Sequence, residues 1–167
     1  FANVVSASNA IGTGSDSAEV FVTPSPLVVH LKFDETGGTT AADSSGRAYH
    51  ATLVNGPPFA PATFGNALVL VSNSFATAKF VRLPNGVTSG LTNFTVSTWV
   101  QMNSIETWQR IFDFGTGTGN YMFLSTQYTP TAPNNAKLRF GIRTTVAAEQ
   151  FVSGTIALPT NAWTHVA

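Results

Sequence analysis

The chain has 167 residues, of which 43% are hydrophobic, so it is long and apolar enough to bury a core. Only 10% of the residues are charged, and the 8 basic and 8 acidic ones cancel, which leaves no electrostatic footprint for nucleic acid. The absence of cysteine excludes disulfides and thiolate metal sites. No apolar run approaches the roughly 20 residues of a membrane span, so no membrane insertion is expected. Low charge with abundant Thr, Ser, Asn and Gly fits a secreted or cell-surface location.

The first 26 residues predict a partial domain followed by a linker. Ala2–Ser6 and Ser17–Val22 are strand-like and are joined by a turn-rich segment, which indicates a β-hairpin. Two strands alone do not make a stable domain. Residues 1–23 resemble the last hairpin of a bacterial immunoglobulin-like domain. Residues 24–26, Pro-Ser-Pro, indicate a short stiff linker.

From Leu27 onward the pattern is that of β-structure. Short β-branched and aromatic runs recur between turn residues, and no stretch keeps a helical apolar spacing over three turns. Lys137–Arg143 alternates most clearly, with apolar side chains inward and Lys137, Arg139 and Arg143 outward. Phe94–Val100 is also strand-like. Its tryptophan, Trp99, is expected in the core, and so is Trp163 near the C-terminus. The other candidate strands are Leu27–Phe33, Ala67–Val71, Lys79–Leu83, Arg110–Phe114, Tyr121–Leu124 and Trp163–Ala167. The fold is therefore predicted to be all-β, an antiparallel two-sheet sandwich or jelly roll.

Several ordered blocks carry a family resemblance across residues 27–167. His30–Gly38, Asp43–Gly46, Phe64–Leu68, Phe94–Val100 and Trp163–Ala167 resemble the laminin-G-like domains of the concanavalin A-like lectin/glucanase superfamily. The stretch from residue 110 to 124 is similar to modules appended to bacterial glycoside hydrolases that act on plant arabinan and related polymers. Such domains normally continue with further strands after the last block. The resemblance therefore implies a laminin-G-like sandwich over 27–167 that is incomplete at its C-terminus, with uncovered strand edges.

The acidic residues argue against catalysis, although the same superfamily includes glucanases. Glycosidases need two cooperating carboxylates, and the glucanase signature Glu-x-Asp-x-x-Glu does not occur in the sequence. Only Asp34 and Glu35 are adjacent, and neighbouring residues in a strand point to opposite faces. A Gly-x-Ser-x-Gly nucleophile motif is also missing. We expect a protein that is not an enzyme.

Two aspartates are candidate metal ligands. Calcium prefers carboxylate and carbonyl oxygens. Asp34 follows a predicted strand, and Asp43 opens the turn Asp-Ser-Ser-Gly. The resemblance implies a structural calcium ion, but it does not locate one. The alternative is that Asp43 caps its own turn through a side-chain hydrogen bond.

A second group of residues is suited to binding sugar. A flat aromatic ring can stack on the apolar face of a sugar ring, while planar polar groups bind hydroxyls. Trp108 and Arg110 fall where a loop enters a strand. Asp113 is placed to accept hydrogen bonds from sugar hydroxyls. Tyr121 and Tyr128 flank the next loop. The alternative is that Trp108 covers a sandwich edge and Arg110 pairs with Glu106 or Asp113.

The two strand arginines at positions 139 and 143 leave two interpretations open. On one outward face they could clamp an acidic or hydroxylated ligand. The expectation is the other interpretation, a solvated strand face.

These observations predict a carbohydrate-binding accessory module of a larger secreted bacterial protein that acts on polysaccharides. Its partners would be a polysaccharide or glycan and the neighbouring domains of the same chain, and its role would be to concentrate substrate. The alternative is a structural or adhesive module of a cell surface or filament; a glycosidase is disfavoured. An exposed aromatic platform near Trp108 and Tyr121 separates the first two, because only binding requires it.

Overall fold

The computed structural model describes residues 27–71, 74, 76–129 and 137–167. The predicted hairpin over 1–23 and the linker over 24–26 lie outside these residues. All the regular structure in the described part is β, and every pair of strands in its sheets is antiparallel. No helix there is long and apolar enough to cross a membrane. The predicted all-β class is confirmed, with antiparallel sheets of the kind that a concanavalin A-like jelly roll uses.

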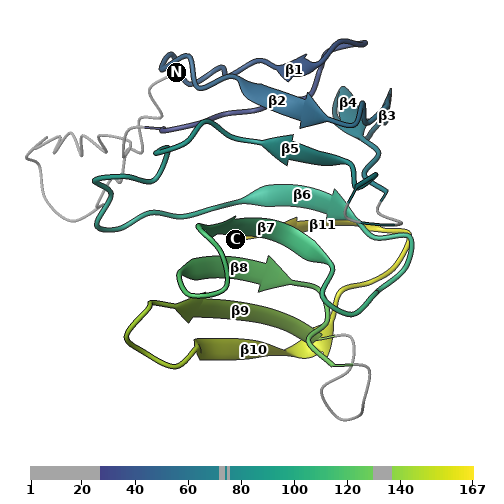
Figure 1. The fold of residues 1–167 in the computed structure, drawn as a ribbon. Helices are drawn as coiled ribbons and strands as arrows, with labels where there is room; N and C mark the ends of the chain where they lie inside the picture. Colours follow the sequence, from purple (N-terminus) through teal and green to yellow (C-terminus); the bar gives the residue numbers. More distant parts are fainter. Residues whose placement is uncertain (1–26, 72–73, 75, 130–136) are drawn as a thin grey trace, which may run out of the picture. The chain divides into compact units, whose positions relative to one another are not determined.

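The chain divides between Leu91 and Thr92 into two compact units, and the described residues of each unit are treated separately. The first unit contains a three-stranded sheet and a two-stranded hairpin (Figure 1). The sheet has the order β1-β2-β5, with β1 at Thr40–Ala41, β2 at Ala51–Val54 and β5 at Phe80–Arg82; the hairpin pairs β3, Phe59–Pro61, with β4, Asn66–Leu68. Its core is built on Ala41, Ala51 and Leu53, with partly buried aliphatic and aromatic side chains packed around them.

The second unit is built on a four-stranded antiparallel sheet. Its order is β10-β9-β8-β7, with β7 at Arg110–Gly115, β8 at Tyr121–Ser125, β9 at Lys137–Arg143 and β10 at Gln150–Ala157 (Figure 1). A separate pair joins β6, Thr98–Gln101, to β11, Trp163–Val166. The long β10 is paired on one side only, so it forms an edge of the sheet.

The strand register separates the two faces of this sheet. Phe112 lies opposite Leu124, which lies opposite Phe140, and these side chains line an apolar hollow on one face. Residues Phe123 and Gly141, which are also cross-strand partners, belong to the other face. The first face is mostly apolar, and the second carries aromatic and charged groups.

Most of the predicted strands are confirmed, with bounds shifted by a few residues. Leu27–Phe33 is not a strand, because Phe33 has a φ of 59° and the segment makes only an isolated bridge from Leu31 to Asp43. The eight-residue β10 was not predicted, because neighbouring bulky apolar residues and a central glycine hide its alternation. Trp99 was expected in the core but is 54% exposed, since β6 buries its alternate residues instead.

Candidate functional site

One face of the four-stranded sheet gathers exposed aromatic rings and guanidinium groups. Trp108 lies just before β7, Tyr128 follows β8, and Phe151 belongs to β10; they are 47%, 37% and 57% exposed. Arg110 and Arg139 lie between and beneath these rings. We call these five residues, brought together from three strands and two loops, the aromatic face.

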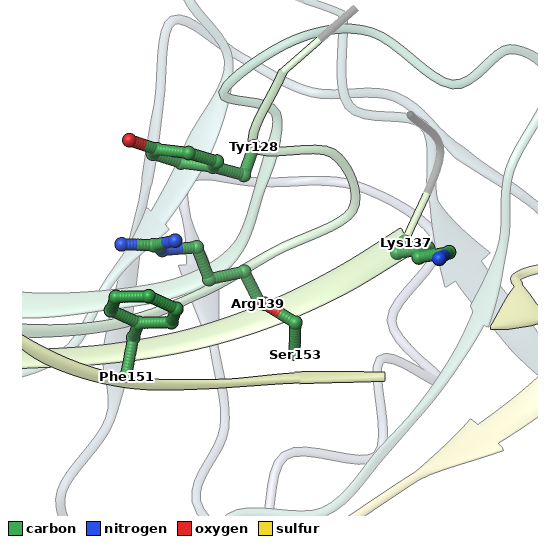
Figure 2. Close-up of a pocket in the computed structure, with 5 residues that line it drawn as sticks. All are labelled: Tyr128, Lys137, Arg139, Phe151 and Ser153. Atoms are coloured by element: carbon green, nitrogen blue, oxygen red, sulfur yellow. The ribbon is translucent and has the colours of Figure 1, made fainter. Parts of the chain in front are cut away.

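Arg139 is held between two of the rings. Its Cζ atom lies 3.7 Å from the centre of the Tyr128 ring and 3.4 Å from the centre of the Phe151 ring, so the guanidinium is sandwiched (Figure 2). The residue is only 6% exposed. The expectation that Arg139 points outward to solvent is therefore wrong, because the rings from a loop and from β10 cover it. Cation–π contacts of this desolvated kind contribute about 2 kcal/mol.

Arg110 makes a similar contact on the opposite edge strand of the sheet. Its Cζ lies 3.8 Å from the centre of the Phe123 ring and 5.0 Å from that of Trp108, and its Nε donates to Asp113 Oδ2 at 3.1 Å. Residues three apart in a regular strand face opposite ways, but a register shift between Arg110 and Phe112 brings Arg110 and Asp113 to one face. The alternative in which Arg110 pairs with an acid is the arrangement found, with Asp113 as the partner. The pair is half-exposed, so it contributes little to stability.

Glu149 connects the remaining groups of this face. It accepts hydrogen bonds from the Arg139 guanidinium and, at 2.6 Å, from the Tyr121 hydroxyl. Burial by itself raises the pKa of Glu149, but the bonds from Arg139 and Tyr121 outweigh it and hold the pKa below its usual value. The bond to Glu149 in turn raises the pKa of Tyr121. Glu149 is therefore an ionised carboxylate that positions both partners. Sequence reasoning missed it because it lies in a loop, ten residues from Arg139.

The backbone around Trp108 is strained and firmly held. Its φ of 65° is unusual for a large side chain. The conformation is maintained by hydrogen bonds from Trp108 N to the Gln127 carbonyl at 2.9 Å and from Thr126 N to the Gln109 carbonyl at 3.0 Å. Thr126 and Ser125 are fully buried. A left-handed residue costs about 1–2 kcal/mol, and such strain is typically kept where a side chain must be aimed. The Trp108 ring is thereby fixed against Tyr128, with ring centres 5.0 Å apart.

Two guanidinium nitrogens on the aromatic face have no hydrogen-bond partner within the described part of the chain. These are Arg110 Nη1 and Arg139 Nε, and both are buried. A buried donor left unpaired costs about 1–3 kcal/mol. Both guanidinium groups lie over aromatic rings, whose faces attract the cations without accepting a conventional hydrogen bond.

The predicted sugar-binding residues are brought together on this face. Trp108 and Arg110 are in contact, Arg110 pairs with Asp113, and the Tyr121 ring lies 5.7 Å from the Phe123 ring that Arg110 covers. Tyr121 is bound to Glu149 and is only partly exposed, so it supports the face from its side. The sequence did not indicate Phe151, which comes from the unpredicted β10.

The two candidate metal ligands, Asp34 and Asp43, lie in the first unit, outside the aromatic face. The Asp43 carboxylate accepts hydrogen bonds from the backbone of His30, Ser45 and Tyr49 and from the Ser45 hydroxyl, at 2.7–2.9 Å. These four donors occupy the lone pairs that a cation would need, so Asp43 caps its turn and does not fit a calcium ligand. Asp34 is exposed, and its backbone carbonyl accepts from Asn66 Nδ2 at 3.3 Å. Across the described residues, no group of three or more His, Asp or Glu side chains is suited to hold a metal. Calcium binding stays a prediction from the resemblance.

Comparison with known protein families places the second unit, and with it the aromatic face, inside a recognised family. Residues 75–167 match the laminin-G-like family model Laminin_G_3, described as the concanavalin A-like lectin/glucanases superfamily. The match covers more than half of the chain. The chain belongs to this superfamily. Searches of curated proteins and of solved structures gave no match. Membership of this superfamily supports a lectin-like module.

Proposed function

We propose that this laminin-G-like chain is a non-catalytic carbohydrate-binding module of a secreted bacterial protein that acts on polysaccharides. One observation carries the proposal: three partly exposed aromatic rings, Trp108, Tyr128 and Phe151, are held on one face of a sheet beside guanidinium donors. Aromatic rings bind the apolar faces of sugars, and guanidinium groups bind their oxygens. A purely structural module has no need of such a face.

The carboxylates on this face support binding rather than catalysis. A glycosidase needs one carboxylic acid whose pKa is raised, so that it can protonate the leaving oxygen. The pKa of Glu149 is lowered, and both of its oxygens are already engaged. Asp113 is paired with Arg110. Glu149 is therefore not prepared to donate a proton to a bound sugar.

The module would act by raising the local concentration of substrate. A polysaccharide held on the aromatic face stays within reach of a tethered catalytic domain, and the gain depends on linker length rather than on new contacts. The strained but hydrogen-bonded Trp108 loop favours this role, because a preorganised ring loses little freedom on binding.

The test is a glycan-array screen followed by affinity electrophoresis with the chain, a Trp108→Ala variant and a Trp99→Ala control. Trp99 is exposed to a similar degree but lies on β6, paired with β11 and outside the aromatic face. We expect Trp108→Ala to weaken binding about tenfold or more and Trp99→Ala to leave it unchanged. Circular dichroism checks that each variant is folded.

The outcomes separate the proposals. Equal loss in both variants would contradict the assignment of the site. A folded chain that binds no glycan would overturn the binding function and favour a structural or adhesive module. Repeating the screen with a calcium chelator tests the predicted calcium ion independently.

A further inference from the structure

Resting on the proposed function, we propose that the ligand is an acidic polysaccharide and that a uronate carboxylate enters a cavity at one end of the aromatic face. The cavity has a volume of about 340 Å³ and is lined by Tyr128, Lys137, Arg139, Phe151 and Ser153 (Figure 2). This volume lies in the lower part of the range of small-molecule sites, about 300–1,000 Å³. The lining contains two cations, two aromatic rings and a hydroxyl group, and it contains no acid.

The charges of the second unit are unevenly placed. Its only lysine and arginine residues are Arg110, Lys137, Arg139 and Arg143. The last three alternate along β9 and so share one face, the same face that carries Arg110 through its register with Ser125. All four cations of the unit are thus gathered on the face that carries the exposed rings.

Only two of these four cations are neutralised. Arg110 pairs with Asp113, and Arg139 pairs with Glu149. In the described part of the chain, no carboxylate lies within ion-pair distance of Lys137 or Arg143. Because Glu149 already balances Arg139, the net positive charge of the cavity comes from Lys137. An anionic ligand would complete the balance that the protein leaves open.

The geometry of Arg139 favours a carboxylate as the bound group. Figure 2 shows its guanidinium edge projecting between the Tyr128 and Phe151 rings, with Lys137 set apart from the stack. A planar carboxylate accepts hydrogen bonds from a planar guanidinium more readily than a neutral hydroxyl does, and the flanking rings provide an apolar surface for the sugar that carries it.

The experiment compares two polymers with the same backbone. Binding of the full chain to polygalacturonate and to its carboxyl-reduced, neutral counterpart is measured by isothermal titration calorimetry. The variants are Lys137→Gln and, as a matched control for net charge, Lys32→Gln, which removes an exposed lysine from the first unit. Each titration is run at about 50 mM and about 500 mM NaCl, because salt screens exposed charge pairs.

We expect the chain to bind the acidic polymer about tenfold or more tightly than the neutral one. Lys137→Gln should weaken that binding about fivefold, Lys32→Gln should leave it unchanged, and high salt should reduce it. Equal affinity for both polymers, or equal effects of the two lysine variants, would overturn the uronate site while leaving the proposed function intact. A folded chain that binds neither these polymers nor any glycan of the array would overturn both.

Discussion

The turn around Asp43 and the cluster around Glu149 use a carboxylate in opposite ways. Asp43 accepts four hydrogen bonds from donors that lie within its own turn or on the adjacent segment at His30. Glu149 instead accepts from Arg139 and Tyr121, two side chains that carry rings or stack on rings. The first arrangement is saturated by the backbone. The second leaves guanidinium donors and aromatic surface unused.

This difference distinguishes a carboxylate that stabilises a loop, Asp43, from one that belongs to a candidate binding site, Glu149. A carboxylate that is satisfied by nearby N–H groups has no valence left for a ligand, so it stabilises the loop that contains it. A buried ion pair that is only partly satisfied is a weak source of stability, because desolvation offsets much of the attraction. Two guanidinium donors near this cluster, Arg110 Nη1 and Arg139 Nε, are buried without a hydrogen-bond partner in the described part of the chain.

The largest expected effect comes from removing the Glu149 carboxylate, which pairs with Arg139. Glu149→Ala should lower the free energy of unfolding of the second unit by about 3–5 kcal/mol, because Arg139 stays buried without its counter-charge. All three tryptophans lie in that unit, so urea unfolding followed by tryptophan fluorescence reports on it selectively. A second replacement, Arg139→Met, made in the Glu149→Ala background, should restore part of the loss. A loss below about 1 kcal/mol would show that the pair is as weak as a surface pair.

A smaller effect is expected from the strained residue beside the cluster. Glycine adopts a φ of 65° at a lower conformational energy than alanine. The free energy of unfolding of Trp108→Gly should therefore exceed that of Trp108→Ala by about 1 kcal/mol. Both variants lose the ring and should bind glycan equally poorly. Chemical denaturation of the pair of variants measures the difference. An alanine variant as stable as the glycine variant would mean that the backbone relaxes and that the ring is not held by strain.

The smallest expected effect is the pH dependence of the stability that Asp43 contributes to its turn. Burial alone raises the pKa of Asp43, but its hydrogen bonds from His30, Ser45 and Tyr49 lower it well below the ordinary value of 3.8. A folded pKa below the unfolded one means that the stabilisation is fully present above about pH 4 and is lost as the pH falls further. The stability difference between the chain and Asp43→Asn, followed by circular dichroism in urea, should therefore be constant from pH 7 to about pH 5 and shrink below 3.8. A difference that already changes near neutrality would contradict this assignment.

The sequence by itself determined the all-β class and much of the strand pattern. The bounds predicted for Lys137–Arg143 match β9 residue for residue, because a period of two marks a strand. The predicted burial does not match, since Arg139 is 6% exposed and Ile142 is 42% exposed. The same period places Trp99 on the face opposite Val100. Trp99 is therefore exposed, although tryptophan side chains are mostly buried in proteins. The turn-capping alternative for Asp43 also follows from local chemistry, since an aspartate reaches the N–H two residues on.

Only the tertiary structure decided how the site is assembled. The register shift in β7 turns Arg110 toward Asp113, and no feature of the sequence announces a bulge at that point. The pairing of β10 with β9 brings Phe151 over Arg139, so a residue that local alternation assigns to solvent is buried. Glu149 reaches Tyr121 across 28 positions of the chain. Local patterns report the face on which a residue lies, whereas contacts between strands depend on register and loop conformation, which are set by packing across the whole sheet.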